Sequence, residues 1–215
     1  MTLLHFQSFI KRYGHIVILR IEELEIPQGL HLLQGPNGSG KSTLLKVLSG
    51  LIPFEGKISL LADIELQKDR KEHRRRVSYC EAEPLFPEFL TGSYLVEMFM
   101  KLKEGSEEEL AEIKTALGIT NYLEQKIGSY SSGMKKKLAL LLAFLGRPDF
   151  ILLDEPLNTL DQVSQEALKA LILTYREKGS SIMLATHQDI IELDLPIDHY
   201  YRIQDQKLRQ YESSI

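Results

Sequence analysis

A glycine-rich segment constrains the fold of this chain more than any other feature: Gly35-Pro-Asn-Gly-Ser-Gly-Lys-Ser42. It follows a short apolar run at residues 30–33 and precedes residues 44–51, whose apolar positions have helical spacing. Glycines let the backbone curl so that successive N–H groups point inward, and the N-terminus of the next helix adds partial positive charge. A loop of this kind, between a strand and a helix, is typical of a polyphosphate cradle.

The residue types of this loop predict the roles of its side chains. The Lys41 ammonium is expected to pair with the β- and γ-phosphates, and the Ser42 hydroxyl to ligate Mg²⁺. The alternative is an ordinary glycine-rich turn, which the strand before it and the helix after it disfavour. The predicted nucleotide-binding residues here are Gly35, Pro36, Asn37, Gly38, Ser39, Gly40, Lys41, Ser42 and Thr43.

A second apolar run, residues 150–153, ends in the carboxylates Asp154 and Glu155. An enzyme with a phosphate cradle presents one acid to the metal and another to water in this way. We expect Asp154 to hold Mg²⁺ directly or through its water shell, and Glu155 to polarise the attacking water. Acidic residues also cap strand ends without any function, but the cradle upstream favours the catalytic interpretation.

The remaining pattern predicts an α/β fold with a P-loop NTPase core around a parallel sheet. A helix at residues 161–178 follows the acidic strand and leads to another buried strand at 181–185. Residues 3–10 and 16–26 predict an N-terminal antiparallel β subdomain, and 199–203 with 207–211 a terminal hairpin.

Between the two halves of the core, the periodicity changes to that of helices. Residues 87–146 predict an inserted α-helical subdomain, in which Ser106-Glu-Glu-Glu109 resembles a capping box. Residues 1–86 and 147–215 would then form the β subdomain and core of a single domain. The charged run Lys68–Arg76 is expected to be a solvated connection between strands, because acids interrupt it and no aromatics interleave.

Composition narrows the cellular setting. The chain has 215 residues and a net charge of −4, which disfavours broad nucleic-acid binding. Its single cysteine, Cys80, cannot form an internal disulfide. The first basic residues follow the N-terminal apolar ones, the reverse of a secretory signal, and no apolar run is long enough to cross a bilayer. We therefore expect a cytoplasmic location, with any membrane function supplied by a partner.

Five segments in order identify a resemblance. After the cradle come Tyr130-Ser-Ser-Gly-Met134, the acidic strand, Leu157-Asn-Thr-Leu-Asp161 and Thr186-His187. This series resembles the nucleotide-binding domain of ABC transporters across nearly the whole chain.

The resemblance implies that two copies meet head to tail and sandwich two ATP molecules. Each site would combine the cradle of one copy with the signature segment of the other: Ser131, Ser132, Gly133 and Met134. By themselves, these residues would be read as a simple helix N-cap before an apolar helix.

The resemblance also assigns roles to three single residues. His187 corresponds to the family's switch histidine, which contacts the γ-phosphate and helps to hold Glu155 and water. Asp161 resembles the D-loop aspartate that couples the two sites, although it also suits a helix N-cap. Tyr13 resembles the aromatic residue that stacks on adenine, although it could equally fill the core of the hairpin.

Two positions depart from the family pattern. Ala82 stands where the family has the Q-loop glutamine that reaches Mg²⁺ and senses the membrane partner, and Ser132 replaces the first glycine of the signature. Carboxylates are good Mg²⁺ ligands, so Glu81 or Glu83 is the candidate substitute for the glutamine. A water molecule could also fill the gap.

The implied function is an ATP-hydrolysing subunit that works as a homodimer on a separately encoded membrane permease, at the inner face of the cell membrane. The alternatives are a nucleotide-gated clamp on soluble partners in DNA repair or at the ribosome, and an ATP binder with weak or no hydrolysis. The intact Lys41, Asp154, Glu155 and His187 argue against the last. The segment that begins at Tyr130 resembles exporter-type subunits mildly more than importer-type ones.

Overall fold

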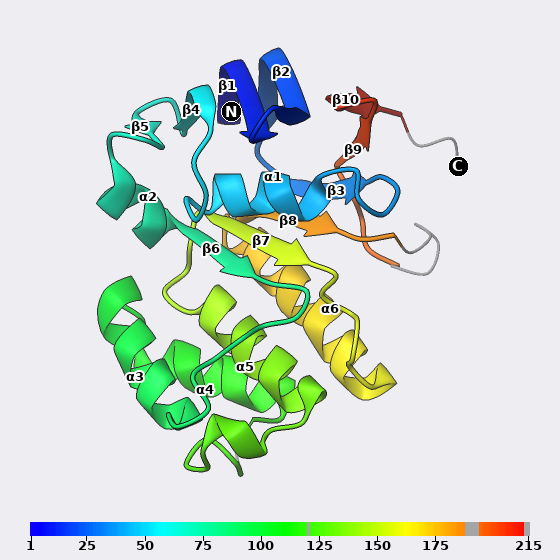
Figure 1. Ribbon diagram of the computed structural model, residues 1–215. Helices are drawn as coiled ribbons and strands as arrows, with labels where there is room; N and C mark the ends of the chain where they lie inside the picture. The colour runs from blue at the N-terminus through cyan, green and yellow to red at the C-terminus, as the bar shows by residue number, and fades with distance from the viewer. Residues whose placement is uncertain (120, 188–193, 213–215) are drawn as a thin grey trace.

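The described strands of the chain form one ten-stranded sheet (Figure 1). The structure, a computed structural model, describes residues 1–119, 121–187 and 194–212. Strand order across the sheet is β5-β4-β1-β2-β10-β9-β3-β8-β7-β6. The strands are β1 (Thr2–Tyr13), β2 (Ile16–Pro27), β3 (Leu30–Gln34), β4 (Glu55–Leu60), β5 (Ile64–Glu65), β6 (Val77–Cys80), β7 (Phe150–Asp154), β8 (Ser181–Ala185), β9 (His199–Gln204) and β10 (Lys207–Tyr211).

The central strands β9, β3, β8, β7 and β6 run parallel, as predicted. Their side chains alternate between two buried clusters, one on each face of the sheet. In β7, for example, Ile151 and Leu153 belong to one cluster, whereas Phe150 and Leu152 belong to the other. Burial on both faces explains why these strands are continuous apolar runs rather than alternating ones.

Helices cover the two faces unequally (Figure 1). The helix α1 packs with the N-terminal strands against one face, and α5 and α6 belong to the cluster on the other. The helices α3, α4 and α5 gather at the end of the molecule away from β1 and β2. The helices are α1 (Lys41–Leu48), α2 (Arg70–Arg76), α3 (Gly92–Lys103), α4 (Glu107–Leu117), α5 (Ser132–Phe144) and α6 (Gln162–Glu177), with a 3₁₀ turn, η1 (Ile127–Ser129).

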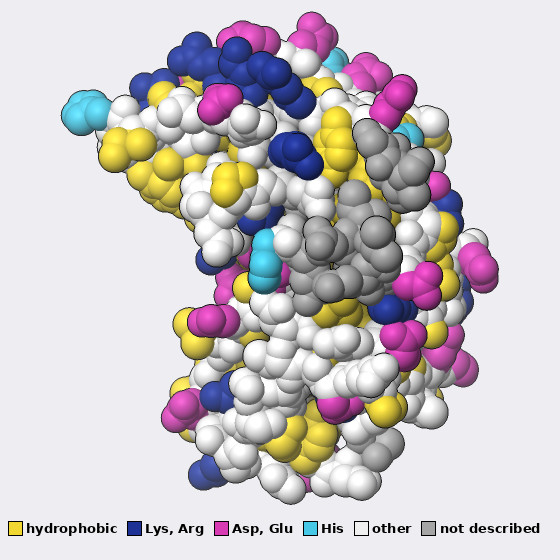
Figure 2. Space-filling view, turned by 90° about the vertical axis from the view of Figure 1, so that its right-hand side faces the viewer, with side chains coloured by type: hydrophobic (Ala, Val, Ile, Leu, Met, Phe, Trp, Pro, Cys, Tyr) yellow, Lys and Arg dark blue, Asp and Glu magenta, His cyan; other side chains and the backbone are white. Residues whose placement is uncertain are grey.

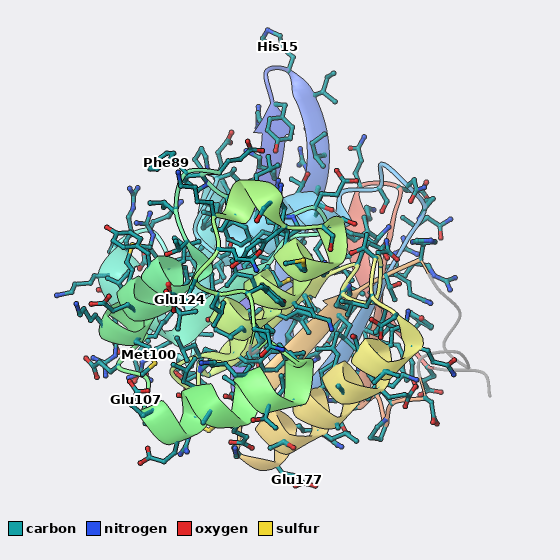
Figure 3. All side chains as sticks on the ribbon, turned by 90° about the horizontal axis from the view of Figure 1, so that it is seen from below. His15, Phe89, Met100, Glu107, Glu124 and Glu177 are labelled. Atoms are coloured by element: carbon teal, nitrogen blue, oxygen red, sulfur yellow. The ribbon has the colours of Figure 1, made fainter. Side chains whose placement is uncertain are left out.

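The N-terminal hairpin extends beyond the rest of the sheet. The strands β1 and β2 pair antiparallel from Thr2 opposite Pro27 to Tyr13 opposite Ile16, and Gly14 makes the turn with a φ of 56°. A positive φ favours glycine at this position. Figure 3 shows His15 at the tip of this projecting hairpin.

The charged run at 68–76 is largely exposed as predicted, but most of it, Arg70–Arg76, forms the helix α2 rather than an irregular connection. Lys103 of α3 explains part of this difference. Its ammonium donates to the carbonyl oxygens of Arg74 (2.6 Å), Arg75 (3.2 Å) and Val77 (2.9 Å), at the end of the helix. A cation at a helix C-terminus satisfies the last carbonyls and favours the helix dipole.

The predicted capping box is half right. Ser106 caps α4, since its Oγ accepts a hydrogen bond from the Glu109 N–H at 3.2 Å. The Glu109 carboxylate, however, does not return to Ser106 but is buried, where it accepts from the backbone N–H groups of Gly146 and Arg147 and from the Tyr175 hydroxyl. This carboxylate therefore joins α4 to the end of the helical insert and to α6.

Candidate functional site: a phosphate cradle with two carboxylates

The predicted cradle lies between β3 and α1. Its glycines Gly35, Gly38 and Gly40 have φ values of 155°, 79° and 108°, a region that residues with a side chain rarely adopt. A Cβ atom at Gly35 would lie 2.7 Å from the Ile203 carbonyl oxygen of β9, so the backbone passes too close for any larger residue. The sequence is therefore glycine-rich here because both conformation and space require it.

Polar groups gather around this loop. The Lys41 ammonium, at the first position of α1, donates to the Gly35 carbonyl oxygen at 2.7 Å. The Ser39 Oγ is buried and has no hydrogen-bond partner among the described residues. A cationic group and an unsatisfied buried hydroxyl within a curl of backbone N–H groups are what a polyphosphate requires.

A cavity of about 880 Å³ opens beside the cradle. Figure 2 shows a face of the molecule that is hollowed between the N-terminal strands and the helices. Four parts of the chain line the cavity: β2, the cradle, the segment after β8 and the terminal hairpin. The lining residues are Val17, Ile18, Gln34, Gly35, Pro36, Asn37, Gly38, Ser39, Thr186, His187, Arg202, Ile203, Gln204, Asp205 and Gln206.

Asp154 ends β7 as a buried carboxylate. Its Oδ2 accepts a hydrogen bond from the Tyr79 hydroxyl at 3.2 Å, and its Oδ1 is buried with no partner among the described residues. Burial raises the pKa of Asp154, and the nearby Ser42 and Tyr79 hydroxyls oppose this shift. An orphan carboxylate oxygen near a serine hydroxyl supplies two oxygen ligands of the kind that Mg²⁺ prefers.

Glu155 is held by three contacts. Its backbone N–H donates to the Ala185 carbonyl oxygen at 2.8 Å, and its φ of 42° turns the chain at this point. The carboxylate accepts from the Thr186 hydroxyl at 3.1 Å and lies 2.8 Å from the His187 Nδ1. Two hydrogen bonds to the two carboxylate oxygens fix their orientation, as expected of a general base with an orienting group.

The signature segment forms the exposed N-terminus of α5. Ser131 caps the helix by accepting from the Met134 N–H at 3.2 Å, and a Cβ at Gly133 would lie 3.1 Å from the Thr159 carbonyl oxygen. Ser131 and Ser132 are exposed. Within the described part of the chain, none of these residues lines the cavity.

Asp161 caps α6, which was one of its two predicted roles. Its Oδ1 accepts from the Ser164 N–H at 2.8 Å and from the Ser164 hydroxyl at 2.9 Å. These hydrogen bonds, that from the backbone first, lower the pKa of the Asp161 carboxyl. The cap does not use the other carboxylate oxygen, so the coupling role stays a prediction.

Three further predicted residues lie outside the cavity lining. The Tyr13 ring is half-exposed at the end of β1, with the Lys11 ammonium 4.4 Å from its centroid. The Glu81 carboxylate lies 3.5 Å from the Lys46 ammonium of α1, and Glu83 is exposed. Their proposed roles toward adenine and Mg²⁺ stay predictions.

The sequence interpretation missed Tyr79 and Thr186, which contact the two carboxylates. Thr186 stands beside His187, and this adjacency was the available signal. Tyr79 reaches Asp154 because β6 pairs with β7, Tyr79 opposite Leu152 and Cys80 opposite Leu153. These two strands are far apart in the sequence, so the spacing of residues within either strand does not predict that they pair.

Comparisons with known proteins identify the family of this chain. Residues 22–158 match the model of the ABC transporter family. The lantibiotic transport ATP-binding protein SrtF of Streptococcus pyogenes is 29% identical over 86% of this chain and 80% of its own length. The ABC transporter ATP-binding protein YybJ of Bacillus subtilis is 32% identical over 75% of each chain. A solved ATP-binding subunit of an ABC transporter superposes with a TM-score of 0.86 at 25% identity, covering 98% of this chain and 90% of the other.

The match extends from the middle of β2 beyond the two carboxylates, and the structural likeness covers almost the whole chain. It confirms the predicted fold class and the predicted ATPase chemistry, and it favours a transport role over a clamp on soluble partners. The chain therefore belongs to the ABC transporter family, as an ATP-binding and ATP-hydrolysing subunit.

Proposed function

We propose that this chain hydrolyses Mg²⁺-ATP between two copies of itself and so drives a separate membrane permease. One observation carries the proposal: Glu155, directly after the buried Asp154, is held through both carboxylate oxygens by Thr186 and His187. Two adjacent carboxylates of this kind suit a reaction in which Asp154 binds the metal and Glu155 activates water.

ATP binding is assigned to the cradle. The backbone N–H groups of Gly38 and Gly40 and the N-terminus of α1 bind the phosphates. The Lys41 ammonium leaves the Gly35 carbonyl oxygen and binds phosphate oxygens instead. The described cavity of about 880 Å³ is large enough for a nucleotide. Tyr13 is proposed to stack on the base from the root of the hairpin turn.

The magnesium site is proposed at Ser42 and Asp154. The Asp154 Oδ1 lacks a partner among the described residues, and the neighbouring serine hydroxyl completes a pair of hard oxygen ligands. When bound, Mg²⁺ neutralises phosphate charge. Glu81 or Glu83 is proposed as a further ligand in place of the glutamine that Ala82 replaces.

Water is activated at Glu155. Its carboxylate takes a proton from the attacking water, while Thr186 and His187 keep that carboxylate oriented. The His187 ring is itself half-exposed at the edge of the cavity and can contact the γ-phosphate. Lys41 remains with the phosphates throughout.

A second copy is proposed to complete the site. The N-terminus of α5, with Ser131 to Met134, offers first-turn N–H groups for a phosphate, apart from that of Met134, which donates to Ser131. Among the described residues, this helix end does not line the cavity of its own chain. A head-to-tail dimer brings this helix end to the cradle of the partner. Asp161 is proposed to couple the two sites across that interface.

The permease is proposed to dock at an apolar groove beside α3. A cavity of about 460 Å³ lies between the segment after β6, α3 and α5, and its walls include Leu51, Leu85 and Phe99. Leu85 is 88% exposed, and Phe89, at the margin of the helices in Figure 3, is 74% exposed. Large apolar side chains exposed together mark a protein interface.

The relatives' names support a membrane permease as the occupant of this groove, since they are ATP-binding proteins of transport systems. No helix in the described part of this chain is long and apolar enough to cross a membrane. The chain is proposed to lie in the cytoplasm, peripheral on the inner face of the membrane through that permease.

The decisive test replaces the proposed base. Glu155→Gln should keep ATP affinity, because the side chain does not touch the cradle, while hydrolysis falls by about a hundredfold or more. With cleavage arrested, a closed dimer should accumulate in Mg²⁺-ATP. Phosphate release measures the first effect and light scattering after size exclusion the second.

The exposed residue Glu22 of β2 offers a matched control, since Glu22→Gln removes the same charge outside the cavity. The control should behave as the wild type. Normal turnover in Glu155→Gln, or a protein that stays monomeric with Mg²⁺-ATP, would overturn the proposed function.

A further inference from the structure

Lys136 is a buried lysine in an apolar helix. Its side chain is 0% exposed in α5, among neighbours such as Leu138 and Leu140 that are also fully buried. No carboxylate lies within ion-pair distance of it in the described part of the chain. A buried ammonium is costly unless hydrogen bonds replace its water, so its retention here requires a reason.

All three N–H donors of Lys136 are used. The Nζ donates to the carbonyl oxygens of Glu81 at 2.8 Å, Ala82 at 3.2 Å and Asp154 at 3.0 Å. A charged donor makes stronger bonds to carbonyl oxygens than a neutral one. Without this donor, three carbonyl groups in a largely buried place would lose a partner.

These three carbonyls belong to two segments that pack against α5. One is the end of β7, where Asp154 is followed by Glu155. The other is the loop after β6, which continues through Pro84, Leu85 and Phe86 along the apolar groove. Lys136 therefore connects the groove, the acidic pair and the helix that begins with the signature residues.

The contact at residue 82 does not depend on a side chain. Ala82 has none that could reach a metal or a partner, but its carbonyl oxygen is bound by Lys136. The position is thus linked to the end of β7 through a lysine of another element.

We propose that Lys136 is a positioning residue that fixes the end of β7 and the 81–86 loop relative to α5, so that movement of the loop at the groove changes the placement of Asp154 and Glu155. The coupling to a permease rests on the proposed function. The positioning itself can be measured on the chain alone.

The test compares Lys136→Met, which is similar in length but donates nothing, with Lys136→Arg, which keeps charged donors. Lys101→Met on α3 is the control, because that ammonium is exposed and pairs with Glu97 one turn away. Steady-state ATPase kinetics give kcat and KM, and amide hydrogen exchange reports on the loop independently of activity.

Lys136→Met should lower kcat by about tenfold to a hundredfold, as loss of a group that orients metal ligands does, with KM for ATP changed less than about threefold. Exchange should accelerate at residues 81–86. Lys136→Arg should retain more of kcat than Lys136→Met does, and its amide exchange at residues 81–86 should be slower than in Lys136→Met. Lys101→Met should match the wild type in both measurements.

Unchanged kcat and exchange in Lys136→Met would overturn the proposal. So would loss of folding or of ATP binding together with turnover in both Lys136 variants, because the lysine would then be a core residue only. The assay contains no permease, so the result for Lys136 does not depend on whether the chain binds one. If the proposed ATPase function is wrong, the wild type itself will show no ATP hydrolysis.

Discussion

At the scale of single residues, the orientation of Glu155 depends on His187. The imidazole Nδ1 lies 2.8 Å from one carboxylate oxygen, and the ring faces the cavity. His187→Ala should therefore lower kcat by about tenfold to a hundredfold, because the base loses an orienting group, while ATP affinity changes little. Phosphate release and equilibrium ATP binding measure the two quantities.

The control is His15→Ala, a histidine at the exposed tip of the hairpin (Figure 3). It should have wild-type kinetics. If His187→Ala keeps kcat within about twofold of the wild type, Thr186 alone orients the carboxylate and the role of His187 is wrong.

Much of the site could be predicted at this scale because its residues are ordered locally. The cradle and the pair Asp154-Glu155 are contiguous in the sequence, and their chemistry follows from residue type. Tyr79 and Lys136 could not be predicted in the same way. Tyr79 acts across a strand pair and Lys136 across a helix packing contact, and neither contact leaves a spacing signal.

At the scale of elements, the strand β3 carries a buried histidine, His31, that makes the free energy of unfolding lower in acid than at neutral pH. His31 is fully buried, stacks on His199 at 5.3 Å, and neither ring nitrogen has a hydrogen-bond partner among the described residues. Burial, reinforced by repulsion from His199, lowers the pKa of His31 to about 3. The folded state therefore binds this proton less readily than the unfolded state, whose pKa is about 6.5.

The sign of the pH effect follows directly. Above pH 6.5 both states are neutral at His31 and the stability is fully present; as pH falls below 6.5 toward 3, only the unfolded state gains the proton and stability is lost. His31→Leu should remove this loss. Its free energy of unfolding relative to the wild type should rise by about 2 kcal/mol between pH 7 and pH 5.

Urea unfolding at several pH values measures this difference. His5→Leu is the control, since its ring is at the surface beside Glu23 and carries no such burial. A difference between His31→Leu and the wild type that is independent of pH would contradict the shifted pKa of His31.

Element positions followed from periodicity, and errors arose where tertiary contacts decided the outcome. The predicted solvated connection contains a helix, α2, that periodicity did not indicate, and Lys103 of α3 binds its last carbonyls. Glu109 has the spacing of a capping box, but its carboxylate accepts hydrogen bonds from the N–H groups of Gly146 and Arg147 instead. Neither contact is visible in the local sequence.

At the scale of the whole molecule, the proposed site is divided between two copies. A substitution at Ser132 can distinguish effects on the chain that carries it from effects on the site of the partner copy. Ser132 is exposed in the first turn of α5. A glutamate at this position favours the helix dipole of its own chain but would face phosphate in the partner's site. Ser132→Glu should therefore fold and bind ATP normally, yet lose at least about tenfold in ATPase activity.

Combined with Glu155→Gln, the same change should abolish the ATP-dependent dimer seen by light scattering. Ser106→Glu would be a poor control, because Ser106 caps α4, so Glu107→Gln on the same helix serves to report general charge effects. An active Ser132→Glu protein would mean that α5 does not face a partner's phosphate.

The overall arrangement was predictable in class but not in detail. Parallel strands around the cradle follow from the alternation of apolar strands and helices. The place of the terminal hairpin does not: β9 and β10 lie between β3 and β2 and so join the core to the N-terminal strands. This hairpin also lines the cavity through residues 202–206, which local pattern gave no reason to expect.

The backbone at Glu155 has an evolutionary consequence. A φ of 42° suits glycine or asparagine better than glutamate, and holding glutamate there costs on the order of 1 kcal/mol. In a gene copy released from selection for turnover, replacement of Glu155 by glycine would relieve this strain, which offsets part of the loss of the hydrogen bonds with Thr186 and His187. Persistence of the acid in a lineage is accordingly a record of continued selection for ATP hydrolysis rather than for a durable fold.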